Sequence, residues 1–177
     1  MEYSSSNQRS SLGLGDTNDV FKKLSQTQIK NAYSQIPSFS VEGTNQSITA
    51  WLVAKHAHHG PDFGLDPDKY GLTQGDLDSI AKNGLINHIR FGGAVPNEQY
   101  VQALQKRWKT FAEHKNVRNC GIQTVIGEQC HVFKHDRTRI FLSFKEDSGE
   151  SFTGYQLNKQ QSLDHNKYGI IGNDYKN

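Results

Sequence analysis

Three histidines fall within four residues of one another, and no other stretch of the chain gathers imidazoles so densely. They are His56, His58 and His59, which follow an apolar segment and stand immediately before Gly60. Imidazole titrates near neutral pH, so a histidine can accept and return a proton in the cell without a metal. The run therefore supplies candidates for a general base.

Two other interpretations of the histidine run remain open. The three imidazoles could bind a metal ion with oxygen ligands from the Asp62–Asp68 loop, although no fourth ligand stands at one of the usual spacings. The run could also be a solvated helix end, where histidine lies at the negative pole of the helix dipole. We expect the general base, with no metal and no cofactor.

A second candidate site lies in the segment Glu150–Leu157, which has the pattern of a strand. Alternation places Thr153 and Tyr155 on one face, about 7 Å apart, and Phe152 on the opposite face in the core. A hydroxyl and a phenol on one face could hold a phosphate oxygen and contact a base. Thr and Tyr are also good strand formers, so the pair is a weak signal when taken alone.

Positive charge concentrates between residues 82 and 139, a segment that contains ten Lys and Arg residues but only four Asp and Glu residues. A surplus of this size predicts a surface that faces phosphate, although ordinary solvated helix and strand faces explain it equally well. Strand alternation places Arg137 and Arg139 on one face, and it places Lys134 and His135 on opposite faces. The pattern does not decide which of these side chains face the cleft. The candidate substrate-binding residues are Lys134, His135, Arg137 and Arg139.

Apolar periodicity changes from about 3.6 in the first part of the chain to 2 after Val117. Gly, Pro and Asp make residues 60–70 a loop, Thr73 and Asp76 form a short capping box, and Asn97 caps the longest helix. The helices we expect cover residues 17–34, 47–56, 73–84 and 97–114. Four antiparallel strands follow, so the fold class is α+β, with N-terminal helices packed on a C-terminal four-stranded meander.

Length and composition limit the possible number of domains, the cellular location and the state of the cysteines. A chain of 177 residues predicts one domain, here residues 17–157 between a flexible lead (1–16) and a polar tail (158–177). No apolar run approaches the roughly 20 residues of a membrane span, and no signal peptide is visible, so we expect action in a cytoplasm. Cys120 and Cys130 are expected to be structural thiols rather than a disulfide.

Together these motifs resemble the metal-independent RNase superfamily that groups barnase, EndoU, colicin-type RNases and RelE-type folds, including toxin domains of contact-dependent inhibition and phage systems. The resemblance rests on the histidine run, on the Leu-Thr-Gln-x-Asp-Leu-x-x-Ile helix at Leu72–Ile80, and on a meander that closes with Thr-x-Tyr. It covers about Ile48–Leu157. The chain lacks the second histidine with Gly-rich neighbours found in EndoU, which leaves the general acid open.

The resemblance implies cleavage of RNA by attack of the ribose 2′-hydroxyl, giving a 2′,3′-cyclic phosphate and a 5′-hydroxyl without a metal. One of the three histidines would be the base, with His59 favoured because it borders the flexible Gly60 turn, and Thr153 and Tyr155 would orient the scissile phosphate. The acid or phosphate clamp would come from the four candidate binding residues. The implied partners are RNA, with tRNA among the candidates, and a cognate immunity or inhibitor protein.

Three other functions compete with this interpretation. A non-catalytic module could bind RNA or protein through the basic segment, and a nuclease could use a metal held by the histidines. ADP-ribosyl transfer also occurs on α+β toxin domains, but the chain shows no convincing series of Arg, Ser-x-Ser and Glu-x-Glu motifs.

Overall fold

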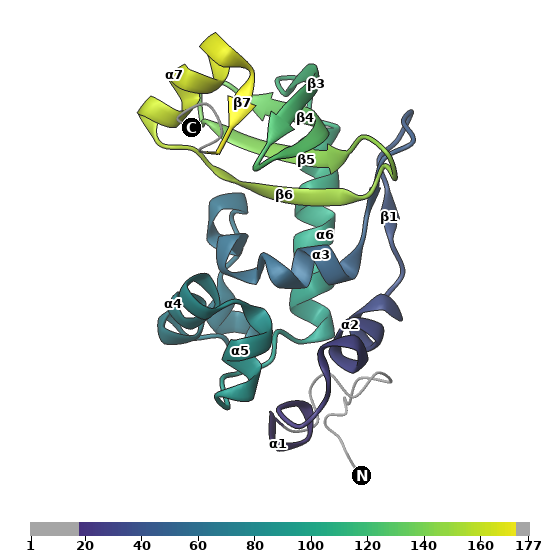
Figure 1. Ribbon diagram of the computed structural model, residues 1–177, viewed down its shortest axis with the longest axis vertical. Coiled ribbons are helices and arrows are strands. Elements are labelled where there is room, and N and C mark those ends of the chain that lie inside the picture. Colours follow the sequence, from purple (N-terminus) through teal and green to yellow (C-terminus); the bar gives the residue numbers. More distant parts are fainter. Residues whose placement is uncertain (1–17, 173–177) are drawn as a thin grey trace. The chain divides into compact units, whose positions relative to one another are not determined.

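The computed structural model describes residues 18–172 (Figure 1). The predicted flexible lead lies outside the described residues. The fold class α+β is confirmed. The chain divides into two compact units where its length predicts one domain: unit 1 runs to Ser38 and resumes over Thr49–Lys106, and unit 2 holds Phe39–Ile48 and the residues from Arg107 onward.

Unit 1 begins with two helices, α1 (Asn18–Phe21) and α2 (Gln26–Ser34), where the sequence predicts one. Ser25 accepts a hydrogen bond from the Gln28 backbone N–H, and the Gln28 side chain accepts one from the Ser25 N–H. This capping box starts a new helix, so the prediction of a single helix is wrong. The predicted end before Pro37 is confirmed.

The histidine run lies where α3 (Ala50–Lys55) passes into a 3₁₀ helix, η1 (Ala57–Phe63). A second 3₁₀ helix, η2 (Pro67–Tyr70), follows it. The sequence predicts a loop over residues 60–70, but most of this segment belongs to the two short helices. Gly64 and Gly71, both in the left-handed conformation, mark the ends of these helices. The segment is therefore more ordered than its Gly, Pro and Asp content predicts.

The next two predicted helices are confirmed with their caps. In α4 (Gln74–Asn83) the Thr73 side chain accepts from the Asp76 N–H, and the Asp76 carboxylate accepts from the Thr73 N–H. In α6 (Glu98–Ala112) the side-chain oxygen of Asn97 accepts from the Tyr100 N–H at 2.8 Å. Both caps depend only on local sequence.

Between these helices lies α5 (Leu85–Arg90), in a segment where the sequence predicts no helix. Its His88 is 1 % exposed, with Nδ1 2.8 Å from the Ser79 hydroxyl and Nε2 2.8 Å from the Ala94 carbonyl. The imidazole thus joins α4, α5 and the segment before α6. His88 has a structural role.

Unit 2 contains a five-stranded sheet in the order β6-β5-β4-β3-β7 and a two-stranded ribbon, β1–β2. The predicted antiparallel meander is present as β3 to β6, but β7 pairs parallel to β3, so the sheet is mixed rather than four-stranded and antiparallel. Packing of the N-terminal helices on this sheet stays a prediction. The strands are β1 (Phe39–Ser40), β2 (Ser47–Ile48), β3 (Arg118–Val125), β4 (Glu128–His135), β5 (Ile140–Lys145), β6 (Ser151–Gln156) and β7 (Ile170–Ile171).

The predicted peripheral tail is wrong for the residues that the structure describes. It forms α7 (Lys159–Tyr168), capped by Asn158, and then β7. The helix has no apolar stripe because its buried side chains are Ser162 and His165. It packs by polar contacts with the sheet, which hydrophobic periodicity cannot detect.

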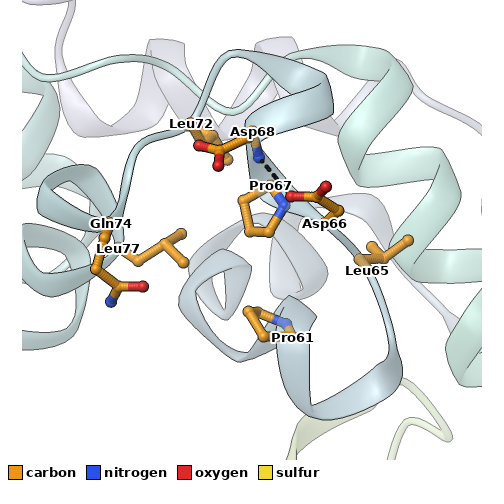
Figure 2. Close-up of a pocket in the computed structure, with 8 residues that line it drawn as sticks. All are labelled: Pro61, Leu65, Asp66, Pro67, Asp68, Leu72, Gln74 and Leu77. Carbon is orange, nitrogen blue, oxygen red and sulfur yellow. Dashed lines mark hydrogen bonds between the residues drawn. The ribbon is translucent and has the colours of Figure 1, made fainter.

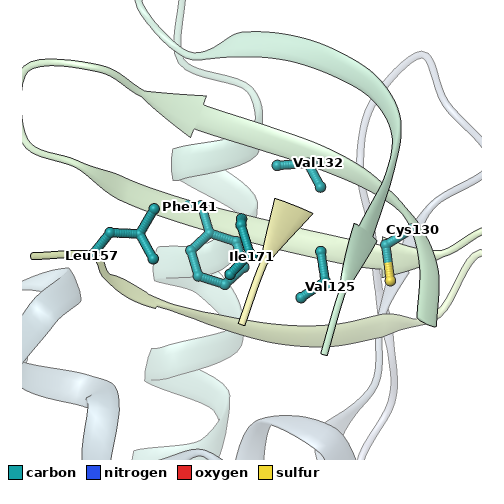
Figure 3. Packing of buried hydrophobic residues seen from close by; sticks show 6 residues of the cluster. All are labelled: Val125, Cys130, Val132, Phe141, Leu157 and Ile171. Carbon is teal, nitrogen blue, oxygen red and sulfur yellow. The ribbon is translucent and has the colours of Figure 1, made fainter. Parts of the chain in front are cut away.

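A buried apolar cluster holds the sheet of unit 2 together (Figure 3). Cys130 belongs to this cluster, whereas Cys120 is half-buried, and both are free thiols, as expected. Cys130 lies opposite Gln123 on β3, so the two cysteines do not face each other across the hairpin. The remaining members of the cluster are Val125, Val132, Phe141, Leu157 and Ile171. Within residues 18–172, no helix has the length and apolar character needed to span a membrane.

Candidate functional site

The structure brings the three histidines of the run together. The ring centroids of His58 and His59 are 4.0 Å apart, and the His56 ring lies 6.4 Å from the first and 6.2 Å from the second. His56 ends α3, and the other two lie in the first turn of η1. The tight junction between the two helices therefore concentrates three imidazoles in one place.

Burial weakens two of these histidines as bases. It lowers the pKa of His56 to about 4, although the hydrogen bond from Nδ1 to the Leu52 carbonyl, 2.8 Å long, acts in the opposite direction. Burial and the neighbouring His59 lower the pKa of His58 to about 3, and within residues 18–172 its buried Nδ1 has no hydrogen-bond partner. A general base works best when its pKa lies near the operating pH, so both rings are poor proton acceptors.

His59 has the geometry of a general base. Its side chain is 25 % exposed, and its Nδ1 lies 3.6 Å from Oδ2 of Asp62, one turn further along η1. A carboxylate beside Nδ1 favours the tautomer with the proton on that nitrogen, which leaves the lone pair on Nε2. The arrangement lets Nε2 take a proton while Asp62 stabilises the imidazolium that forms.

The Gly60 turn is not the flexible feature that the sequence predicts. Gly60 is buried, and the Tyr100 hydroxyl crosses beside it to donate a 2.6 Å hydrogen bond to the Ala57 carbonyl. A Cβ atom added at Gly60 would overlap the Tyr100 hydroxyl. The glycine is required for close approach, and Tyr100 fixes the backbone that carries the histidines.

We expect Gly60→Ala to destabilise the protein by about 1 to 3 kcal/mol, the usual cost of forcing extra volume into a packed site. Gly75→Ala is the matched control, because a Cβ there meets only the Thr73 hydroxyl, at 3.6 Å, on the exposed side of α4. Alanine is a better helix former, so this control should be neutral or slightly stabilising. Thermal melting of both variants checks the prediction, and equal melting temperatures would contradict the close contact with Tyr100.

The predicted pair on β6 does not have the predicted surroundings. Thr153 is 2 % exposed, and its backbone N–H and carbonyl both bond the Ser143 hydroxyl. The Tyr155 ring packs edge-on against Phe141, with 4.7 Å between centroids, and burial raises the pKa of its phenol. The pair belongs to unit 2 and the histidines to unit 1, so the prediction that they share a cleft stays a prediction.

Simple alternation fails in β6. Phe152 and Tyr155, three residues apart, both pack against the buried cluster of unit 2, whereas alternation places them on opposite faces. The pairing of β5 with β6 shifts register between Leu142 and Phe144, which is the mark of a β-bulge. The prediction that Phe152 lies opposite Tyr155 is therefore wrong.

Lys134 is a structural cation rather than an accessible phosphate ligand. Its side chain is fully buried, and Nζ donates to the Ser162 carbonyl at 3.2 Å and to Oδ1 of Asn166 at 3.0 Å. Burial lowers its pKa, which Asp136 at 3.9 Å partly offsets. The lysine attaches α7 to β4.

Arg137 and Arg139 lie in the turn between β4 and β5, so strand alternation does not relate them. Arg139 has a positive φ of 65°, and its Nε donates to the Leu157 carbonyl at 3.0 Å. This bond joins the turn to the end of β6. Arg139 is thus engaged in the fold, and Arg137 is exposed.

A surface pocket of about 270 Å³ brings together two of the four predicted binding residues, His135 and Arg137. Asn116 and Asp136 complete the lining. The ring of His114 lies beside His135, with centroids 6.3 Å apart. The β4–β5 end of the predicted basic surface therefore forms a concave site.

The sequence pattern suggests Asp62 only as a possible metal ligand, and it does not indicate His114 or Asn116 as site residues. Asp62 stands three residues after His59, a spacing that brings two side chains together on one turn of a helix. The sequence therefore contains the signal for this contact, but the signal can be recognised only if the segment is taken as a helix rather than a loop. His114 and Asn116 depend on how the chain turns after α6. No motif marks such a turn.

Acidic residues of the loop after the histidines line a different pocket, drawn in Figure 2. The Asp66 carboxylate accepts from the Asp68 N–H at 3.2 Å and caps η2. Within the described part of the chain no three His, Cys, Asp or Glu side chains are grouped to hold a metal ion. The other lining residues are Pro61, Leu65, Pro67, Leu72, Gln74 and Leu77.

No protein-family model matches the chain, and comparison with curated proteins and with solved structures also finds no match. The resemblance to metal-independent RNases therefore depends on the short motifs alone.

Proposed function

We propose that the protein is a metal-independent endoribonuclease with His59 as its general base. The observation that carries the proposal is the 3.6 Å contact between His59 Nδ1 and Asp62 Oδ2 on a partly exposed ring, which favours the tautomer with its lone pair on Nε2. Fixed backbone supports this geometry, because Tyr100 bonds Ala57 and packs against Gly60.

In this reaction the 2′-hydroxyl of a ribose gives its proton to His59 Nε2 while its oxygen attacks the adjacent phosphorus. The bond from phosphorus to the 5′-oxygen breaks, and that oxygen takes up a proton from solvent water as it leaves. The products are a 2′,3′-cyclic phosphate and a 5′-hydroxyl. Asp62 stabilises the imidazolium that forms during the attack.

Digestion of total RNA by the purified full-length protein in EDTA tests the proposal. We expect fragments whose 5′ ends are phosphorylated by polynucleotide kinase without prior phosphatase treatment, because a 5′-hydroxyl is the predicted product. Fragments that form only without EDTA would indicate a metal-dependent nuclease. Intact RNA that shifts on a gel would indicate the non-catalytic binding module.

A further inference from the structure

The pocket beside the β4–β5 turn presents hydrogen-bond donors fixed by the backbone. The Thr138 N–H donates to His135 Nδ1 at 3.2 Å, and the Asn116 N–H donates to His114 Nδ1 at 3.0 Å. A backbone N–H can only donate, so both Nδ1 atoms must be acceptors. In each neutral ring the proton therefore lies on Nε2.

This tautomer distinguishes His135 and His114 from His59, which has Asp62 beside its Nδ1. His135 and His114 offer Nε2–H groups, which donate to an oxyanion but cannot accept a proton from a hydroxyl. His59 has the reverse arrangement, with Asp62 at Nδ1. Of the two histidines, His135 lines the pocket, and there its Nε2–H is suited to donate to an anion rather than to remove a proton.

Charge in the pocket also favours an anion, although Asp136 lines it. Arg118 holds the Asp136 carboxylate with two hydrogen bonds of 3.0 Å, and Lys134 Nζ lies 3.9 Å away. Both cations neutralise the single carboxylate. Arg137, by contrast, is exposed and makes no hydrogen bond or ion pair with any residue between 18 and 172, so its guanidinium is available to a ligand.

We propose that this pocket binds a phosphate group of RNA through Arg137 and the Nε2–H of His135, with the side-chain amide of Asn116 as a further donor. The identity of RNA as the ligand rests on the proposed function, whereas the affinity for an oxyanion follows from the donors alone. The pocket is a binding subsite rather than a source of the general acid, because His135 Nδ1 already accepts a backbone hydrogen bond.

The tautomers are the first test. Long-range ¹H–¹⁵N spectra of the full-length protein above pH 7.5 should show His135 and His114 with the proton on Nε2, and titration with inorganic phosphate should shift the His135 resonances. A proton on Nδ1 of His135, or no shift with phosphate, would overturn the proposal.

RNA binding is the second test, measured by anisotropy of a labelled single-stranded RNA in EDTA with His59→Ala present in every protein to block cleavage. Arg137→Ala should weaken binding and reduce the log–log salt slope by about 0.7, the contribution of one phosphate contact on a single strand. His135→Phe should weaken binding about 10- to 150-fold, the effect of one hydrogen bond to a charged group, and leave the slope unchanged because it removes no charge. Lys159→Ala removes an exposed charge outside the pocket lining and is the matched control.

The two proposals fail separately. If Arg137→Ala and Lys159→Ala change the slope equally, the pocket is not the phosphate site, even where the parent protein still cleaves RNA. If the parent leaves RNA intact but binds it in a manner that depends on Arg137, the pocket proposal stands and the nuclease proposal falls.

Discussion

His59→Ala is expected to lower the rate of RNA cleavage by about 10²- to 10⁴-fold, the usual contribution of a positioned proton-transfer group. The side chain is 25 % exposed, so the melting temperature should remain close to that of the parent. Cleavage of a defined RNA, followed with time alongside thermal melting, measures both quantities. A variant that folds and cleaves like the parent would remove His59 as the base.

Variants of the neighbouring residues separate catalysis from packing. His56→Ala deletes a ring that bonds the Leu52 carbonyl, so we expect loss of stability, with any loss of cleavage following from it. Asp62→Asn keeps the size of the side chain but removes the charge that faces His59. It should fold normally and cleave more slowly than the parent, but faster than His59→Ala.

Where the sequence predicted the fold, the information was local. The bonds between Thr73 and Asp76 and the cap at Asn97 are made within three residues, so residue types alone locate both helices. Ser25 and Gln28 carry the same local signal, but apolar residues continue in helical steps across it, so periodicity alone predicts a single helix. Periodicity identifies a helical face, whereas a cap identifies where a helix starts.

Where prediction failed, the structure depends on contacts distant in sequence. β7 is two residues long and exists because it pairs with β3, and α7 is attached through Lys134 to residues about 30 positions away. The bulge in β6 likewise belongs to its pairing with β5. The local sequence pattern of β7, α7 or β6 carries no information about which distant segment each of them contacts.

The candidate site shows the same division. The density of histidines was visible in the sequence, but the choice among them required the burial of His56 and His58 and the position of Asp62. The basic segment predicted phosphate binding, yet only the structure shows that Lys134 is buried and that Arg137 is exposed in the pocket. Charge count predicts the kind of ligand, and side-chain contacts decide which charges can reach it.

We expect the protein to lose stability as the pH falls from about 6.5 to about 4, because histidines buried in neutral form must become charged. His165 on α7 is 2 % exposed, and burial together with Lys134 and Arg118 lowers its pKa to about 4, against an opposing effect of Asp136. Its Nδ1 is buried without a hydrogen-bond partner among residues 18–172. Asp136 favours the imidazolium, but burial and the two neighbouring cations outweigh it.

The sign follows from where protons bind. In the unfolded chain His165 takes up a proton below its ordinary pKa of about 6.5, whereas in the folded protein it stays neutral until about pH 4. Between these values the unfolded state binds more protons, so stability is complete above pH 6.5 and decreases as the pH falls. The lowered pKa corresponds to a loss of about 3 kcal/mol, and His56 and His58 act in the same direction.

Denaturant unfolding at pH 7 and pH 4.5 measures this loss, and two α7 variants identify its source. His165→Gln removes the titrating ring, so the difference in unfolding free energy between the two pH values should shrink markedly. Asn166→Ala removes a contact of Lys134 on the same helix but no titrating group, so it should lower stability by a similar amount at both pH values. An acid response that His165→Gln leaves intact would assign the loss to the carboxylates or to the other buried histidines. The dependence on His165 is expected because α7 packs through polar side chains, and charging one of them inside a cationic cluster opposes that packing directly.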